Sequence, residues 1–275
     1  MIRGITGQWA FPIAYYFSAE ATQSYEIQRM LTDILDNLET LWIRVRVCIS
    51  DMGFTNQGVF RRFSISEDRP FILKHGRKTY FMYNPCHLVN LLRTHLERKK
   101  GFIYSDGTAL WIHLVQAYSI DSGTENRLMP KLTRAHFELT DKSRMKVKLA
   151  TQLFSNSVSA GMKTLGELDL MGKSALETVN FVKKMYNMFD MMNISDEYNP
   201  NHLKSGRNVF ANRHLFLEYK EFIGSLKCVN GKPLPDCIRG TILSLQVLND
   251  LLVDLQQKEY RYVLTRRIQQ DALEH

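Results

Sequence analysis

The first hundred residues alternate between patterns typical of strands and patterns typical of helices. Trp9 to Phe17 is a run of aromatic and apolar residues, which is the composition of a buried strand. Between residues 27 and 38, apolar residues recur every three or four positions and predict an amphipathic helix. Leu41 to Ile49 is rich in β-branched residues and predicts a second strand, with Arg44 and Arg46 on one face. This part of the chain therefore predicts a mixed α/β unit.

The pattern changes after Gly101. Before it, we expect a helix over 55–63, a strand over 79–83 and a helix over 88–98. After it, long helical patterns dominate, separated by turn-rich connections. The predicted helices span Ala109–Tyr118, Arg144–Leu165, Lys173–Met192, Asn212–Leu226 and Ile238–Leu255, and the last ten residues, Arg266–His275, are helical in pattern too. We expect two structural units, with a boundary near residues 93–101.

Composition limits the class of protein. The 275 residues are 44% hydrophobic and 23% charged, as in a soluble globular protein with a sizeable core. There is no run of eighteen or more apolar residues and no secretory leader pattern, so we expect no membrane span. The four cysteines form no C-x-x-C pair, which favours reduced thiols in the cytosol or nucleus and argues against a zinc site.

The formal net charge of +8 favours a polyanionic partner, because each Lys or Arg placed against a phosphate releases condensed counterions. The basic residues are scattered, so a nucleic-acid surface would have to be assembled by folding. Tyr260 to Arg267 pairs aromatic with basic residues, which suits a DNA backbone contact. The alternative interpretations are a merely basic protein and, for this segment, a solvated helix face.

Asp51 is the sharpest candidate for chemistry. It follows a predicted strand and precedes a small-residue turn and a predicted helix. Open α/β sheets place ligand-binding groups at the carboxyl ends of strands, and a carboxylate there can hold Mg²⁺ through oxygen. Asp51 could equally begin the turn or cap the following helix. The residues alone leave both roles open.

Two other patterns are better explained without chemistry. Gly172-Lys173-Ser174 resembles the end of a phosphate-binding loop, but the required earlier glycine would fall at position 167, which is Glu167. We therefore reject this type of nucleotide binding and interpret Gly172 as a break before a helix. Four methionines recur at helical spacing and are more typical of core filling than of a cofactor site, namely Met185, Met188, Met191 and Met192.

Five segments, in order along the chain, resemble the motifs of one family. Gly7 to Phe17 is similar to G-Q-W-x-x-P-x-x-Y-x-F, and Ser50 to Asn56 is similar to C-D-x-x-x-x-N. Asn84 to Arg93 is similar to D-P-x-H-L-x-K-x-x-R, and Phe189 to Asn193 to F-D-x-x-N. Tyr262 to Glu274 is similar to Y-x-L-T-x-x-L-S-Q-D-x-L-E. Together they resemble the P-element-type DNA transposases and their vertebrate THAP-domain homologue.

The resemblance implies a fold that is α/β plus all-α. It would be a partial RNase H-like core, a mixed sheet with helices, interrupted by a large, mostly helical insertion domain that binds GTP. On this basis residues 1–92 would form the partial core, residues 93–262 the insertion domain, and residues 263–275 the start of the core helix with the last catalytic carboxylate. DNA and GTP are the implied partners, with a second copy of the chain in a homo-oligomer as a further one, and the nucleus is the implied location.

The resemblance also implies site residues. Asp51 and Glu274 would be catalytic carboxylates that hold Mg²⁺ in a two-metal site for DNA cleavage and strand transfer. Asp190 and Asp271 would belong to the site of GTP, which is a cofactor that the family does not hydrolyse. For Asp190 the alternative is a capping or ion-pairing role within its own helix.

Three departures from the family pattern matter. The family's first catalytic Asp lies upstream of the G-Q-W segment, where this chain begins, so we expect a truncated core and no strand transfer by this chain alone. Asn84 stands where the family has Asp, and Tyr186 stands where the insertion usually has Asn. The alternative to a transposase fragment is a domesticated, non-catalytic module that binds DNA or protein.

Overall fold

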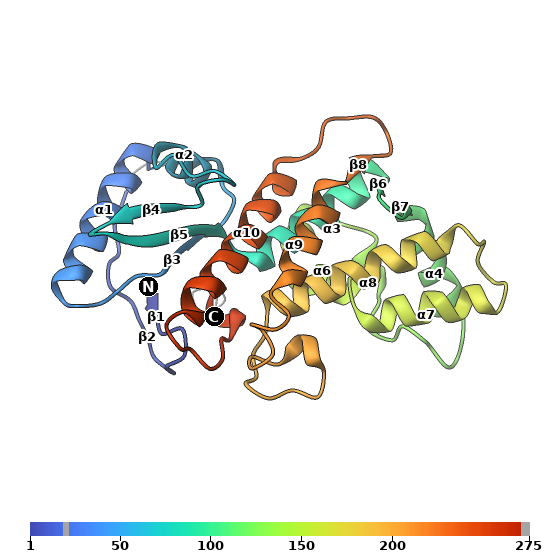
Figure 1. Cartoon of the computed structure of the whole chain (residues 1–275). Helices are drawn as coiled ribbons and strands as arrows, with labels where there is room; N and C mark the ends of the chain where they lie inside the picture. Colours follow the sequence, from blue (N-terminus) through green and yellow to red (C-terminus); the bar gives the residue numbers. More distant parts are fainter. Residues whose placement is uncertain (19–21, 271–275) are drawn as a thin grey trace. The chain divides into compact units, whose positions relative to one another are not determined.

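The computed structural model describes residues 1–18 and 22–270 (Figure 1). Its residues divide into two compact units, and neither is continuous in sequence. Unit 1 comprises Met1–Pro85, Met191–Leu217 and Gly240–His275, and unit 2 comprises Cys86–Asp190 and Glu218–Arg239.

Unit 1 is built on a small mixed sheet. Among the described residues, this sheet has the strand order β3 (Val47–Ser50), β5 (Arg77–Tyr83) and β4 (Phe71–Lys74). β3 runs parallel to β5 and β4 antiparallel to it, with Ser50 opposite Tyr83. The helices α1 (Ser24–Thr40) and α2 (Phe54–Arg62) follow the hairpin of β1 (Ile2–Arg3) and β2 (Ala10–Phe11) and flank β3 in sequence.

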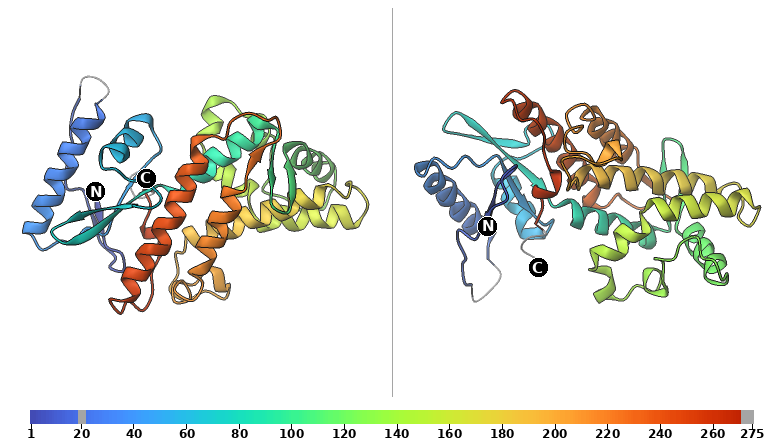
Figure 2. Two further views of the ribbon diagram at one scale, coloured as in Figure 1. Left: turned by 45° about the horizontal axis from the view of Figure 1, so that its top comes forward. Right: turned by 90° about the horizontal axis from the view of Figure 1, so that it is seen from below.

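Side-chain alternation along β5 explains how the two faces of this sheet are covered. Phe81 points to α2, where its ring meets that of Phe60 edge-on at 5.5 Å. Tyr80 points the other way and donates from its hydroxyl to Asp254 at 2.9 Å, on helix α10 (Asp236–Gln256). Figure 2 shows α1 and α2 on one side of the sheet and the later turns of α10 on the other. The sheet is thus a central layer between helices.

Unit 2 combines helices with a second sheet. Among the described residues, β6 (Gly101–Tyr104) lies between β7 (Gly107–Leu110) and β8 (Lys227–Cys228). Phe181 of the long helix α8 (Ala175–Met192) is fully buried, and its ring lies 5.7 Å from that of Tyr104 and 5.6 Å from that of Phe222. Among the described residues, the other helices of this unit, in whole or in most of their length, are α3 (Pro85–Lys99), α4 (Trp111–Ser122), α5 (Asp141–Arg144), α6 (Val147–Leu153), α7 (Asn156–Glu167) and α9 (His214–Gly224), with a 3₁₀ turn at Arg134–His136. The 3₁₀ turns at His202–Lys204 and Thr265–Arg267 belong to unit 1.

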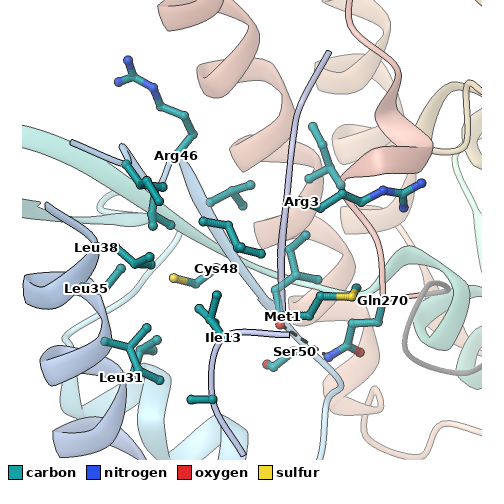
Figure 3. Close-up of a pocket in the computed structure, with 18 of the residues that line it drawn as sticks. Met1, Arg3, Ile13, Leu31, Leu35, Leu38, Arg46, Cys48, Ser50 and Gln270 are labelled. Carbon is teal, nitrogen blue, oxygen red and sulfur yellow. Dashed lines mark hydrogen bonds between the residues drawn. The ribbon is translucent and has the colours of Figure 1, made fainter. Parts of the chain in front are cut away.

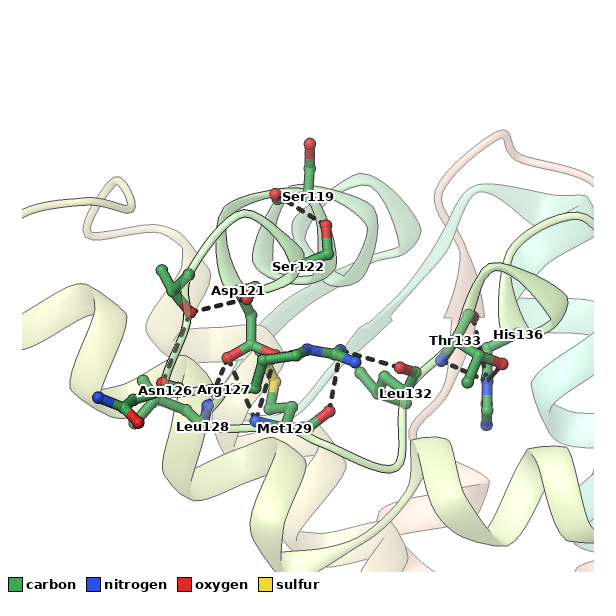
Figure 4. Close-up of polar contacts among 11 residues, drawn as sticks. Ser119, Asp121, Ser122, Asn126, Arg127, Leu128, Met129, Leu132, Thr133 and His136 are labelled. Carbon is green, nitrogen blue, oxygen red and sulfur yellow. Dashed lines mark hydrogen bonds and ion pairs between the residues drawn. The ribbon is translucent and has the colours of Figure 1, made fainter.

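A buried carboxylate holds the loop after α4. Asp121 has a fully buried side chain and accepts hydrogen bonds from the backbone N–H groups of Leu128, at 2.6 Å, and Met129, at 3.2 Å (Figure 4). Arg127 donates from Nε to the same carboxylate at 3.1 Å. Since a buried charge is stable only when it is paired and hydrogen-bonded, these bonds fix the loop against the helices.

The predicted mixed α/β and helical fold class is confirmed, and so are most of the helices. The methionines of α8 do fill the core, because Met185, Met188 and Met191 are fully buried and Met192 is 1% exposed. The break at Gly172 also falls between two helices, since α7 ends at Glu167 and α8 begins at Ala175.

Three predictions about elements are wrong. The segment from Trp9 to Phe17 is not a buried strand, because only Ala10–Phe11 pair and the Phe17 side chain is 94% exposed. The helix expected over 144–165 is broken at Ser155, whose hydroxyl accepts from the Val158 N–H and starts α7 anew. The region after Gly101 is not all helical, since it contains β6, β7 and β8.

The expected final helix over 266–275 is only partly described. Thr265–Arg267 is a 3₁₀ turn, and residues 271–275 lie outside the described residues.

Candidate functional site

Asp51 lies where the sequence predicts it, directly after β3 and ahead of α2. Its Oδ1 accepts from the backbone N–H of Gly53 at 2.8 Å and from the side-chain amide of Asn56 at 2.7 Å. The first of these bonds makes the tight turn that leads into α2. Asp51 therefore does form the turn, and it uses one of its two carboxylate oxygens to do so.

Packing against α10 fixes this turn from one side. A Cβ on Gly240 would lie 2.7 Å from Sδ of Met52, so the helix approaches the turn as closely as a glycine allows. Ser244, one turn further along, accepts from the Tyr83 N–H at 3.0 Å. The carboxyl ends of β3 and β5 are thus held together beneath α10.

The end of the neighbouring strand brings Asn84 beside Asp51 in the fold. The buried Asn84 donates its backbone N–H to the carbonyl of Ser50 at 2.8 Å, which continues the β3–β5 pairing by one residue. Since parallel strands end at the same edge of a sheet, Asp51 and Asn84 occupy equivalent positions there. The amide of Asn84 stands where the family has a carboxylate, so this edge carries less negative charge than the family pattern.

The last described residue also reaches this edge. Gln270 donates from its side-chain amide to the carbonyl of Ile49 at 3.4 Å, two residues before Asp51, and Figure 3 shows Gln270 beside Ser50. Gln270, the residue before Asp271 in the sequence, therefore lies next to the end of β3. Asp271 and Glu274 themselves lie outside the described residues.

A groove of about 1460 Å³ runs along β3. β3 pairs with β5 on one edge and has no strand partner on the other within the described residues. The groove is lined there by apolar side chains of α1, among them Leu31, Leu35 and Leu38, and by Cys48 of β3 (Figure 3). Burial raises the pKa of the Cys48 thiol to about 12.

The described residues provide an incomplete set of metal ligands. Within residues 1–18 and 22–270, no three His, Cys, Asp or Glu side chains gather closely enough to hold a metal ion. Asp51 is half-buried and is the described member of the predicted pair; Glu274 is the other.

Asp190 lies in the last turn of α8, half-buried and close to Tyr219 of α9. Burial raises the pKa of Tyr219 to about 12, and the negative charges of Glu218 and Asp190 act in the same direction. Asp190 is therefore embedded among side chains of unit 2 rather than on an open helix face. The hydroxyl of Tyr219 is a hydrogen-bonding group near Asp190, and a site that reads a base needs such groups.

The segment from Tyr260 to Arg267 is not a helix face. Val263 and Thr265 are fully buried, and the Thr265 hydroxyl donates to the carbonyl of Met191 at 2.7 Å. Arg267 donates to the carbonyl of Gly7. Most of this segment thus stabilises unit 1, whereas Tyr260 at its start lines the groove.

Comparison with known families and proteins agrees with this geometry. A model described as the TNP-like RNase H N-terminal domain matches residues 1–64, and one described as the TNP-like GTP-binding insertion domain matches residues 86–206. The structure named Drosophila P element transposase strand transfer complex is similar over 99% of this chain, with a TM-score of 0.86 and 25% identity.

The chain is homologous to the P-element transposases.

Curated relatives in the family are much longer than this chain. The transposable element P transposase of Drosophila melanogaster is 25% identical over all of this chain, which spans 37% of that relative. The human DNA transposase THAP9 is 26% identical over 72% of this chain, corresponding to 22% of its own length. This chain covers 62% of the chain in the similar solved structure.

These matches assign an RNase H-like N-terminal domain and a GTP-binding insertion domain to this chain. The predicted boundaries at 92/93 and 262/263 stay predictions; the compact units divide the chain elsewhere, after Pro85 and at three later points. None of the described helices is both long and apolar enough to cross a membrane.

Proposed function

We propose that this chain is the central part of a P-element-type transposase, with a carboxylate site for phosphoryl transfer on DNA in unit 1 and a guanine-nucleotide site in the insertion domain. The observation that carries the proposal is the position of Asp51 at the carboxyl end of β3, close to Gln270. Its oriented turn leaves one carboxylate oxygen for a cation.

Asp51 and Glu274 are the proposed ligands of Mg²⁺. When bound, the metal ions supply positive charge to the attacking and leaving oxygens of the phosphate. The role of Asp51 is to present one oxygen in a fixed direction, which the bonds from Gly53 and Asn56 achieve through the other oxygen. Because this chain offers two of the family's carboxylates, we expect weak metal binding and no strand transfer by the chain alone.

For GTP we propose Asp190 and Asp271. A carboxylate can accept two hydrogen bonds from the N1–H and N2–H₂ edge of guanine, which adenine does not offer. The polar surroundings of Asp190, near Tyr219, support this role. DNA as a partner, nuclear location and homo-oligomer formation complete the proposal, and the net charge of +8 supports the first of these.

A second candidate function is a domesticated module that binds DNA or protein without catalysis. The same positive charge favours it, because counterion release requires no metal ligands. Metal binding at Asp51 separates the two functions.

Paramagnetic broadening by Mn²⁺ tests the metal site. We expect the resonances of Asp51 and Glu274 to broaden at lower Mn²⁺ concentrations than those of Asp33, an exposed carboxylate on α1. Asp51→Asn should weaken this broadening while preserving the fold, because the amide oxygen still accepts from Gly53 and Asn56. Asp33→Asn is the matched control and should leave it unchanged. Equal broadening at Asp51 and Asp33 would remove the metal role and favour the non-catalytic module.

A further inference from the structure

A strained and exposed tryptophan lies just before β3. The Trp42 N–H donates to the carbonyl of Glu39 and the Ile43 N–H to that of Leu38, both at 2.9 Å, which ends α1 in a turn that usually takes glycine. Trp42 adopts the left-handed conformation there, with φ of 60°, and its side chain is 81% exposed. A non-glycine residue in this conformation costs about 1 kcal/mol, so the position is better suited to binding than to stability.

Three basic residues in this region have no carboxylate partner within the described part of the chain. Arg44 and Arg46 make no ion pair among the described residues, and neither does Lys258 beyond the end of α10. The nearby carboxylates are already occupied: Asp36 by Lys74 at 2.8 Å, Glu39 by Arg77 at 2.5 Å, and Asp254 by Lys78 at 3.8 Å. These ion pairs leave Arg44, Arg46 and Lys258 without a carboxylate partner among the described residues.

Electrostatics shows that these cations are close together. Burial lowers the pKa of Lys258, and so do the charges of Arg46, Arg44 and Arg77, with Asp254 opposing them. Two segments that are distant in sequence are therefore brought into one positive surface, and a polyanion bound there would relieve the repulsion.

This surface continues into the groove along β3. Trp42, Arg44, Arg46 and Tyr260 all line the groove, so it contains both aromatic and basic side chains. A smaller cleft beside Arg44, Arg46 and Arg77 has a volume of about 20 Å³, room for a single water rather than a small-molecule ligand. The surface is therefore suited to an extended polyanion lying across it.

We propose that Trp42, Arg44, Arg46 and Lys258 bind a single-stranded segment of DNA, a site separate from the carboxylate edge. Guanidinium groups pair with backbone phosphates, and an exposed aromatic ring stacks on an unpaired base. Arg46 and Asp51 lie at opposite ends of β3, five residues apart or roughly 17 Å. The bound strand is thus held away from the reacting phosphate. This inference rests on DNA being the partner in the proposed function.

Fluorescence anisotropy with a labelled 20-nucleotide oligo(dT), over a range of NaCl concentrations, tests the cations. Replacing all three by glutamate (Arg44→Glu, Arg46→Glu, Lys258→Glu) should reduce the slope of log affinity against log salt by about 2, since each phosphate contact on a single strand contributes roughly 0.7. The matched control is Lys131→Glu, Lys173→Glu, Lys232→Glu, which changes the net charge equally at exposed lysines of unit 2. This control variant should keep most of the slope of log affinity against log salt.

Trp42→Gly tests the stacking without the risk of misfolding. Glycine relieves the left-handed strain, so this variant should melt at a higher temperature than the wild type and yet bind oligo(dT) at least about fivefold more weakly. Its salt slope should stay unchanged.

The outcomes separate the two levels of the proposal. If the wild type binds no DNA at low salt, both the DNA partner and this site are wrong. The site is wrong, and the DNA partner stands, if the wild type binds DNA but the control variant loses as much salt dependence as the variant with glutamate at positions 44, 46 and 258, which we call the cluster variant. The same conclusion follows if Trp42→Gly binds oligo(dT) as tightly as the wild type does. Tighter binding to anionic phosphatidylserine vesicles than to oligo(dT), lost in the cluster variant, would also overturn it in favour of a membrane surface.

Discussion

Asp51 illustrates how two interpretations of one residue can both hold. The sequence offers a turn-forming role and a metal-binding role as alternatives, and the structure shows the first through the bonds from Gly53 and Asn56. A carboxylate has two oxygens and about four lone pairs, so a turn made through Oδ1 does not use up the group. It also orients the other oxygen, which is what a metal ligand requires.

At the same scale, Cys48 should be an unreactive thiol. Burial raises its pKa from 9.0 to about 12, so the neutral thiol dominates at all pH values below the raised pKa. Because the thiolate is the nucleophile, native Cys48, which is half-buried, should react with iodoacetamide at pH 8 at least about tenfold more slowly than Cys48 in unfolded protein. Peptide mass spectrometry of native and urea-unfolded samples measures this. A native rate within tenfold of the unfolded rate would mean that the groove does not bury the thiol.

Among elements, most helices and the strands β3 and β5 were predictable, and the strands β6, β7 and β8 were not. α1, α2, α3, α8 and α10 follow from apolar periodicity, because each buries one face over several turns. The hairpin of β6 and β7 has four residues a strand, too short for a clear period, although Ser105-Asp106-Gly107 is a turn signal between two apolar runs. Glycine is favoured at Gly107, since its φ of 144° is a conformation that L side chains rarely adopt.

The failed strand over Trp9 to Phe17 has a different cause. Its composition is apolar, but burial depends on a covering layer, and β2 pairs only with the two-residue β1 among the described residues. For the candidate site, Asp51 could be placed from the local pattern alone. The positive surface of Arg44, Arg46 and Lys258 could not, because it joins segments more than 200 residues apart.

Two glycines of α7 provide a test of packing at this scale. A Cβ on Gly161 would lie 2.6 Å from Cγ of Met129, in the loop that Asp121 holds in place, whereas Gly166 has open space around it. Gly161→Ala should lower the free energy of unfolding by about 1 kcal/mol, since overpacking exceeds the gain in helix propensity. Gly166→Ala should raise it by about 0.5 kcal/mol. Urea denaturation distinguishes them, and equal signs would contradict the tight contact.

At the scale of the whole molecule, the division into units depends on contacts that no local pattern contains. Helices α8, α9 and α10 each begin in one unit and end in the other, so helical periodicity continues across the boundaries without a linker or a change in composition. Sequence patterns therefore predict the helices but not the points within α8, α9 and α10 at which the units divide. The expectation of a core interrupted by an insertion came instead from the motifs that resemble the family and from their order along the chain.

The insertion domain should distinguish guanine from adenine. In calorimetry with the whole chain, we expect GTP to bind more tightly than ATP, because a carboxylate pairs with the guanine edge. Asp190→Ala should weaken GTP binding by at least about tenfold and leave ATP binding unchanged. Glu221→Ala, an exposed carboxylate of α9, is the control. Equal heats for the two nucleotides, or GTP binding unaffected by Asp190→Ala, would remove the base-reading role.

The discontinuity of unit 1 has a consequence for synthesis on the ribosome. The ends of β3 and β5 are completed by Gly240 and Ser244, which are translated 155 residues or more after Pro85. At 5–20 residues per second this delay is roughly 8–30 s. Unit 2, whose last residue is Arg239, is therefore complete in sequence first. The face of β5 that α10 covers emerges early and stays uncovered until α10 is made, so the nascent chain should need a chaperone during that interval more than the released protein does.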